Sequence, residues 1–384
     1  MRVSRGLAGV LGVLTATGWA ANHFSATIPV FVDDRGLSVA LLDAVFGIYA
    51  LGLLPGLVTG GSLSDRVGRA RVVLPGALLA AVGTVVLLSW HDPAGLLLGR
   101  FVVGLGAGLT FGAGTAWAAD LGGTTGTVLA GVFLTAGFGV GPLTSGALAQ
   151  WAPGPLVTPF ALSLVLSLAA VAVAWRVSVP VSGRPHGDAG PASPAPHQSA
   201  RAALTWSLPV AVVVFGSATV ALVTLTPRLP AGVDGPFLFG VSAILSLGGG
   251  VGVQALARQR GWGPRSGVAG LLASALGFGL VAAGGEQVGV PLFVVVCVVM
   301  GVAYGLCLRE GLLDVETLAP PARRGLLTGV FYVATYLGFG LPLLLTLLDP
   351  YAGVVLPAAG FAVLALALAA CRGVQLRGGH PARA

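Results

Sequence analysis

Apolar runs of about 20 residues recur along the chain, and each is long enough to cross a membrane as an α-helix. Short polar segments rich in arginine, glycine and proline separate the runs. The pattern predicts twelve membrane-spanning helices, six in each half of the chain. Their ranges are 7–30, 40–60, 72–90, 95–118, 127–149 and 157–175, followed by 204–226, 236–256, 266–284, 289–309, 325–347 and 353–371.

One long polar segment rich in proline, residues 177–203, divides these helices into two halves. It predicts a flexible cytoplasmic linker between an N-terminal six-helix bundle, 1–176, and a C-terminal six-helix bundle with a short cytoplasmic tail, 204–384. The halves echo each other at an offset of about 195 residues, since similar loops, SLSDRVG and ALARQRG, follow the second helix of each half. Such a repeat predicts two pseudo-symmetric bundles with a binding site between them near the middle of the membrane.

Charged residues make up 9% of the 384 residues and hydrophobic residues 55%, and the mean hydropathy is +0.94. A soluble globular protein carries roughly 25% charged residues. The composition therefore predicts an all-α integral membrane protein with no room for a folded soluble domain. Arg2 and Arg5 before an apolar run, and small residues at Ala20 and Ala21, are also typical of a secretory signal peptide. The length of the run and the spans that follow favour an uncleaved first helix.

All 20 basic residues are arginine, and their distribution predicts the orientation of the chain. If the N-terminus is cytoplasmic, Arg35 and Arg228 lie outside and Arg100 lies within a span, whereas the other arginines fall in cytoplasmic tails, loops or helix ends. This bias predicts a multi-pass protein of the cell inner membrane with both termini in the cytoplasm. The net charge of +7 then indicates topology and contact with anionic lipid headgroups, not nucleic-acid binding.

Residues 60–71, GGSLSDRVGRAR, form the loop between the second and third predicted helices. Gly61 allows a helix end to approach its neighbour closely, and Gly68 permits a tight turn. Asp65 is the only acid in this loop, where it stands among arginines that include Arg66 and Arg69. A carboxylate fixed there can pair with an arginine or a helix N-terminus, holding one conformation and releasing another. The alternative is a plain arginine-rich turn.

This loop resembles the loop 2–3 motif of the major facilitator superfamily, whose transporters have twelve spans in two six-helix halves. The resemblance covers essentially the whole chain. It implies that the aspartate and arginines latch the cytoplasmic gate in the outward-open state. By the same resemblance, Asp65 faces the start of the eleventh span near Arg324, and Arg69 reaches Asp120 at the end of the fourth. The second copy of the loop departs from the pattern, with Arg258 where Asp65 stands in the first.

Arg100 lies inside the fourth predicted span and is followed by Gly104, Gly106 and Gly108. An arginine within the hydrocarbon is costly and by default suggests a function. The fourth span of the superfamily similarly carries an arginine followed by spaced glycines, which the resemblance associates with proton coupling. The alternative is that Arg100 extends to the outer membrane interface.

Small residues and a proline mark the fifth predicted span, at Gly137, Gly141, Pro142 and Gly146. Glycines four apart provide a flat face for close helix contact, and proline bends the helix. The pattern is similar to the antiporter motif of the superfamily's drug/proton exporters, with Ser145 in place of one of the paired glycines. The resemblance implies export by proton antiport and a mobile helix interface.

Polar or aromatic side chains recur at every fourth residue of the first predicted span and so share one helix face. They are Thr15, Trp19, His23 and Thr27, with Asn22 beside them. His23 is the only histidine within a predicted span, and histidine titrates nearest physiological pH. We expect His23 at a depth close to that of Arg100, whose charge would hold it neutral until a substrate changes the balance. A structural hydrogen bond to a neighbouring helix is the alternative.

Acidic residues are scarce inside the predicted spans. In the first six spans they lie only near helix ends, at Asp43, Asp65 and Asp120, although many drug/proton antiporters carry an embedded carboxylate in the first or fourth span. Glu310 ends the tenth span beside Arg309, and the pair forms either an interfacial ion pair or a proton site.

Aromatic side chains in the spans could line a cavity suited to lipophilic or weakly polar ligands, or they could serve packing alone. They are Tyr49, Tyr304, Tyr332 and Tyr336, together with Trp19.

Together these features predict a secondary active transporter that exports a small amphipathic or lipophilic compound by proton antiport with alternating access. A proton symporter or facilitator that imports a nutrient is the alternative. We find no HExxH, no GxSxG and no paired acids within the spans, so the sequence argues against an intramembrane enzyme. The expected partners are the substrate, protons and lipids; we expect a monomer, no cofactor and no metal.

Overall fold

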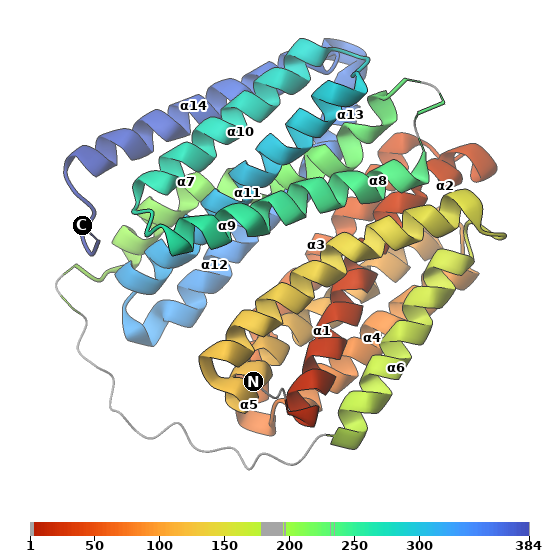
Figure 1. The fold of residues 1–384 in the computed structure, drawn as a ribbon, viewed down its shortest axis with the longest axis horizontal. Helices are drawn as coiled ribbons and strands as arrows, with labels where there is room; N and C mark the ends of the chain where they lie inside the picture. Colours follow the sequence, from red (N-terminus) through yellow and green to blue (C-terminus); the bar gives the residue numbers. More distant parts are fainter. Residues whose placement is uncertain (1–3, 178–194, 196, 231, 234, 384) are drawn as a thin grey trace. The chain divides into compact units, whose positions relative to one another are not determined.

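The computed structural model describes residues 4–177, 195, 197–230, 232–233 and 235–383, which are almost entirely helical (Figure 1). In these residues, ten helices are long and apolar enough to cross a membrane. One of them, α5 (Pro93–Trp151), consists of two helical arms joined at Gly123, whose φ of +58° favours glycine. The first predicted span is interrupted, with α1 (Arg5–Asn22), the 3₁₀ turn η1 (His23–Thr27) and α2 (Ile28–Arg35) in succession. The prediction of an all-helical membrane protein is therefore confirmed.

The chain divides into two compact units. Unit 1 comprises Met1–Gly187 and Gly235–Val241. Its helices are α1, η1, α2, α3 (Val39–Val67), α4 (Ala70–Ser89), α5, α6 (Thr158–Val177) and the larger part of α8 (Pro236–Ala243). α5 lies against α1, α3 and α4, and buried apolar side chains such as Leu14, Val73 and Ala113 fill the space between them.

Unit 2 comprises Asp188–Asp234 and Ser242–Ala384. Its helical elements are α7 (Ala200–Thr219), η2 (Val220–Thr224), η3 (Thr226–Arg228), the end of α8 (Pro236–Ala243), η4 (Ile244–Gly248), α9 (Gly249–Gln259), α10 (Arg265–Gly284), α11 (Val290–Leu318), η5 (Pro321–Arg323), α12 (Arg324–Tyr336), η6 (Leu337–Gly340), α13 (Leu341–Ala352) and α14 (Val355–Arg377). α11 packs against α7 and α10, and α10 packs against α14.

The predicted linker, 177–203, lies mostly outside the described residues. α6 ends at Val177, and α7 begins at Ala200, inside the predicted linker. The boundaries of the two predicted bundles therefore stay a prediction.

Glycines bring α3 and the first arm of α5 into backbone contact. A Cβ atom added to Gly56 of α3 would lie 2.6 Å from Leu105 O, and one added to Gly108 of α5 would lie 2.8 Å from Leu57 N. Real side chains do not fit at such distances, so glycine is required on both faces. In a membrane, where apolar surface gains little from leaving lipid, close packing of this kind is a principal source of helix association.

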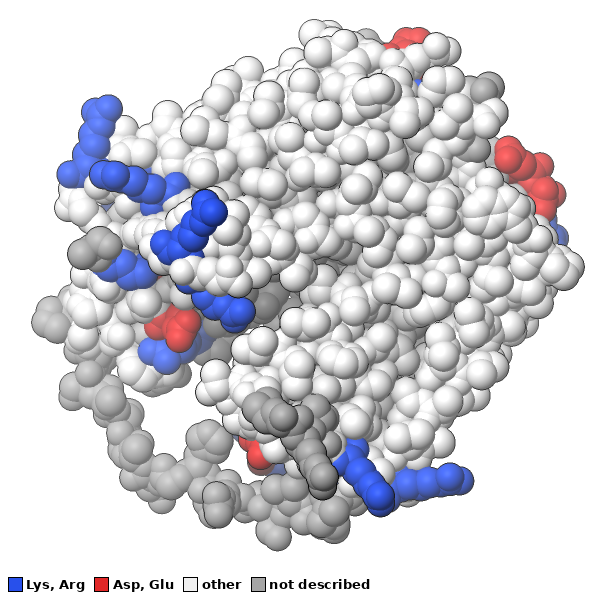
Figure 2. Space-filling view, in the orientation of Figure 1, with Lys and Arg blue, Asp and Glu red and all other residues white. Residues whose placement is uncertain are grey.

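Large apolar side chains cover the outer surface of the helices. Leu51, Trp151, Trp175, Leu356 and Val363 are each more than half exposed, as expected of helices whose outer faces contact apolar lipid tails. In the face that Figure 2 shows, the visible charged side chains lie toward the ends of the helices, and the middle of each unit's surface is uncharged.

Candidate functional site

Arg100 of α5 is fully buried in unit 1. Its Nη1 donates a hydrogen bond of 2.8 Å to Ala21 O, and its Nη2 donates one of 3.4 Å to Phe46 O. The guanidinium lies 4.6 Å from the ring centre of Tyr49 and 5.3 Å from that of Phe24. Within the described residues, Arg100 forms no ion pair with a carboxylate. Carbonyl dipoles and aromatic faces therefore solvate the cation in place of a counter-ion.

The interruption of the first span lies directly beside this arginine. α1 ends at Asn22, whose φ of −120° and ψ of −11° leave the α-helical region, and the 3₁₀ turn η1 follows. Ala21 O, which accepts from Arg100, belongs to the last turn of α1, where carbonyl groups lack their usual helical donors. The helix end thus supplies an acceptor deep inside the unit.

His23 begins the 3₁₀ turn and is fully buried. Its Nδ1 lies 3.2 Å from Trp19 O and 3.5 Å from Ser163 Oγ, and its ring packs edge-on against Phe160. A carbonyl oxygen can only accept, so the Trp19 contact requires the proton on Nδ1. Nε2 is then an acceptor, and it has no hydrogen-bond partner in the described part of the chain.

The four-residue periodicity of the first span does not carry all of its polar side chains to one site, because the helix is interrupted at His23. Thr15 Oγ1 donates to Leu11 O and Phe133 O. Asn22 donates to Phe138 O, and Thr27 donates to Phe24 O in its own turn. The structure therefore places Thr15 and Asn22 against the second arm of α5, and His23 against α6.

The glycines predicted to form a helix interface in the fifth span do pack against a neighbouring helix. A Cβ atom added to Gly137 would lie 2.9 Å from Trp19 N, and one added to Gly141 would lie 2.9 Å from Trp19 Cα. Pro142 is buried next to this contact. Gly146 faces a different element, since a Cβ atom there would lie 2.9 Å from Phe237 Cα at the start of α8.

The loop between α3 and α4 forms an ion-pair cluster on the side predicted to face the cytoplasm. Arg69, directly before α4, pairs with Asp65 in the last turn of α3, and its Nε lies 3.0 Å from Asp120 Oδ2 of α5. Arg69 Nη1 also donates to Ser64 Oγ, at 2.7 Å. The structure thus contains the contact of Arg69 with Asp120 that the resemblance implied, whereas it pairs Asp65 with Arg69.

The backbone of this loop and the charge of Arg69 follow from their surroundings. Gly68 has a φ of +101°, a left-handed conformation that side chains disfavour, and it ends α3. Gly61 faces open space, and Arg66 is exposed. Partial burial acts to lower the pKa of Arg69, but the carboxylates of Asp120 and Asp65 outweigh it and raise that pKa above its usual value.

The predicted tyrosines lie in both units. Tyr49 is buried beside Arg100 in unit 1. In unit 2, Phe215 of α7 lies 5.7 Å from Tyr304 and 4.6 Å from Tyr336 between ring centres, and Tyr332 lies 6.5 Å from Tyr336. These three tyrosines therefore belong to one aromatic cluster.

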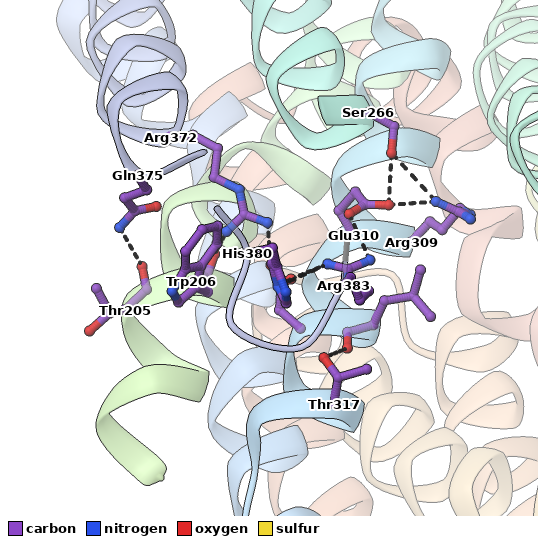
Figure 3. Close-up of polar contacts among 12 residues, drawn as sticks. Thr205, Trp206, Ser266, Arg309, Glu310, Thr317, Arg372, Gln375, His380 and Arg383 are labelled. Atoms are coloured by element: carbon purple, nitrogen blue, oxygen red, sulfur yellow. Dashed lines mark hydrogen bonds and ion pairs between the residues drawn. The ribbon is translucent and has the colours of Figure 1, made fainter. Parts of the chain in front are cut away.

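Glu310 does not end its helix, since α11 extends to Leu318 and buries the carboxylate completely. Its Oε1 accepts from Ser266 Oγ at 2.7 Å and pairs with Arg309 (Figure 3). One turn later, Asp314 is also fully buried and pairs with Arg372 of α14. Asp314 was not among the predicted site residues, because the tenth predicted span ends at residue 309 whereas α11 extends to Leu318. The spacing of the two acids, four residues apart on a helix, was the signal that could have found them.

Asp43 lies near the start of α3, at a helix end as predicted, but its side chain is buried, with only 2% exposed. Unit 1 therefore holds a buried carboxyl group as well as a buried histidine. The described residues contain no group of three or more histidine, cysteine or acidic side chains that could hold a metal ion.

Comparison with known proteins gives a family match and structural matches that each cover most of the chain. Residues 9–371 match the Major Facilitator Superfamily. A solved structure of a mutant of the peptide transporter POT in complex with alafosfalin superposes with a TM-score of 0.80 at 17% identity, covering 98% of this chain and 96% of that one. A POT family transporter in complex with 5-aminolevulinic acid superposes with a TM-score of 0.77 at 14% identity, with 96% of each chain covered. At these identities the likeness concerns the fold alone.

Matches to curated sequences are more local. The multidrug resistance protein MdtL of Klebsiella pneumoniae (strain 342) is 33% identical over 81 residues, which is 21% of this chain and 21% of that protein. MdtL of Escherichia coli O45:K1 (strain S88 / ExPEC) is 34% identical over 84 residues, or 22% of each chain. The matched part of the chain thus spans about a fifth of the length of these relatives.

Proposed function

The chain belongs to the Major Facilitator Superfamily of secondary transporters, and from this premise we propose that it exports a small amphipathic or lipophilic compound in exchange for protons. We place it in the cell inner membrane with both termini in the cytoplasm, following the positive-inside bias of its arginines. The superfamily is one of transporters and not of enzymes. Its members move a substrate without a chemical reaction, so the site must couple substrate binding to proton binding.

The observation that carries the proposal is the packing of Gly137 and Gly141 on Trp19 of α1. These glycines belong to the segment that resembles the antiporter motif of drug/proton exporters, and they hold the helix that ends beside Arg100. The local similarity to MdtL, a protein named for multidrug resistance, supports the same direction of transport.

The proposed coupling groups are His23 and Asp43, with Arg100 as the fixed charge. His23 and Asp43 are buried side chains of unit 1, and each carries a group that can gain and lose a proton. Arg100 keeps its charge, because a guanidinium does not deprotonate in proteins. A proton on His23 adds positive charge near Arg100, and a proton on Asp43 removes a negative charge from the same unit. Departure of either proton favours binding of a cationic or polar group. Substrate and proton would thereby compete for one site, which is the requirement for antiport.

Everted membrane vesicles test this proposal. Respiration acidifies their interior, and a transported compound added outside should release protons through the antiporter, which a pH-sensitive dye detects. His23→Ala and Asp43→Asn should abolish this response while leaving expression intact. His91→Gln, which changes a histidine outside the spans, is the matched control and should respond normally at neutral pH.

Normal, pH-dependent transport by both His23→Ala and Asp43→Asn would show that neither side chain couples transport to protons. Accumulation of substrate in the direction of proton flow would instead favour the alternative, import by proton symport. A thermal-shift screen over antibiotics, dyes and sugars provides the compounds for both measurements.

A further inference from the structure

Two buried carboxylates, of Glu310 and Asp314, lie one turn apart on α11 in unit 2. Figure 3 shows the first of them, Glu310, with Arg309, Ser266 and Arg383 around it. Glu310 and Asp314 are both fully buried. An isolated charge in such a place is costly, so each carboxylate requires partners.

Arginines of the helices already balance the charge of both acids. Arg309, next to Glu310 on α11, pairs with that carboxylate. Arg372 of α14 lies 2.6 Å from Asp314 Oδ2, donates to Trp206 O at 2.7 Å, and stacks 4.4 Å from the centre of the Trp206 ring. Two acids and two helix arginines therefore form a neutral group without any further residue.

The C-terminal tail, residues 378–383, adds a further cation to this neutral group. The chain turns back after α14 through Gly379, whose φ is +80°. Arg383 then reaches both acids, with Nη1 3.1 Å from Glu310 Oε2 and Nη2 paired with Asp314 Oδ1. The Arg383 side chain remains 17% exposed, whereas the acids are 0% exposed. The Arg383 side chain therefore reaches the buried acids from the solvent-exposed edge of the cluster.

His380 fixes the tail in this position. Ala382 N donates to His380 Nδ1 at 3.1 Å, which places the imidazole proton on Nε2. Nε2 lies 3.0 Å from Asp314 Oδ1 and can donate to it, and the ring packs edge-on against Trp206 at 4.6 Å. The tail thus contacts α7 and α11 through two side chains.

We propose that Glu310 and Asp314 form a guanidinium-binding site, and that the C-terminal tail of this chain occupies it reversibly through Arg383. The acids remain neutralised by Arg309 and Arg372 when the tail leaves, so release does not strand an unpaired charge. A planar guanidinium with two parallel donors bridges two carboxylates, whereas an ammonium ion is a single point donor. The site therefore prefers arginine to lysine.

The internal repeat explains why this site is open to the tail. Asp314 follows Asp120 by about 195 residues, the offset that relates the two halves of the sequence. In unit 1, Asp120 receives Arg69 from the loop after α3. In unit 2, the arginines that the structure places on Asp314 are Arg372 and Arg383, neither of which comes from the loop after α9. The tail provides the partner that the altered second loop does not.

Hydrogen exchange of the tail amides, measured by mass spectrometry on the full-length protein in detergent, tests the proposal. Arg383→Gln should speed exchange of the Ala382 amide at least tenfold, because a hydrogen bond within the tail persists only while the tail is docked. Arg383→Lys should give an intermediate rate. Arg377→Gln is the matched control, since Arg377 is an exposed arginine at the end of α14, and exchange should stay at the wild-type rate.

A competition on the unmodified protein tests the ligand class. Methylguanidinium chloride should speed exchange of the wild-type tail at concentrations where methylammonium chloride has no effect. Equal exchange rates of the Ala382 amide in Arg383→Gln and the wild type would show that Arg383 does not hold the tail in place. Equal effects of the two salts would overturn the guanidinium site.

Discussion

Arg100 is a buried cation that is solvated by carbonyl oxygens and aromatic rings. Two backbone acceptors, Ala21 O and Phe46 O, come from different helices, so the side chain also joins α1 to α3. Arg100 therefore has a structural role, because it fixes the end of α1. It also has a proposed functional role, because it keeps a positive charge beside His23.

Substitution of Arg100 separates these two roles. Arg100→Ala leaves two buried carbonyls without their donor and a cavity between three helices, so we expect a loss of stability of about 3 kcal/mol or more. Arg100→Lys retains the charge but not the fork of donors, so it should lose less stability. Thermal unfolding in detergent measures both. An Arg100→Ala variant as stable as the wild type would show that the carbonyl contacts contribute little.

His91, in the turn between α4 and α5, is a second histidine beside an arginine. Arg35 Nη2 lies 3.2 Å from its Nδ1, and burial together with the Arg35 charge lowers its pKa below the usual 6.5. The unfolded chain therefore takes up a proton at a higher pH than the folded protein does. Stability from this group is complete above pH 6.5 and is lost as the pH falls below it.

We expect His91→Gln to reduce the difference in thermal midpoint between pH 7.5 and pH 5 (about one unit above and one and a half units below the usual histidine pKa). Glutamine can still accept from Arg35 but does not titrate. An unchanged pH dependence in this variant would assign the acid sensitivity to other groups.

At the scale of helices, the first arm of α5 depends on its glycines for contact with α3. Gly108→Ala should destabilise the protein by about 1–3 kcal/mol, because the helices must separate to admit a methyl group. Gly131→Ala, in the second arm, is the control, since no atom lies within 4 Å of its added Cβ. It should gain up to about 1 kcal/mol from helix propensity. Changes in thermal midpoint of equal size and sign in the two variants would contradict the proposed role of the α3–α5 contact.

Most helices, and the contact of Arg69 with Asp120, could be predicted from the sequence because hydrophobic runs and local motifs encode them. The interruption at His23 could not, because it accompanies a tertiary contact from Arg100 to Ala21 O. The burial of Asp314 also could not be predicted from the hydrophobic pattern, since a charged residue normally marks the end of a span. Its neutralisation comes from Arg372 and Arg383, which are distant in sequence.

For the whole molecule, the loop after α3 is the predicted cytoplasmic latch. Asp65→Arg reverses the charge that pairs with Arg69, and the resemblance implies that Asp65 also stabilises the outward-open state. We expect the variant to shift toward the inward-open state. Labelling of single cysteines near the ends of the helices should increase on the cytoplasmic side and decrease on the outer side. Unchanged labelling on both sides would refute the latch.

Transport in reconstituted vesicles with an imposed pH gradient measures whether export is coupled to proton entry. A compound identified by thermal shift is supplied outside vesicles that are more acidic inside. In protein molecules oriented with the cytoplasmic face outward, uptake should require the gradient, should stop when an ionophore collapses it, and should be accompanied by proton release. Uptake that follows protons into the vesicle when the gradient is reversed, and is absent in the first arrangement, would contradict antiport.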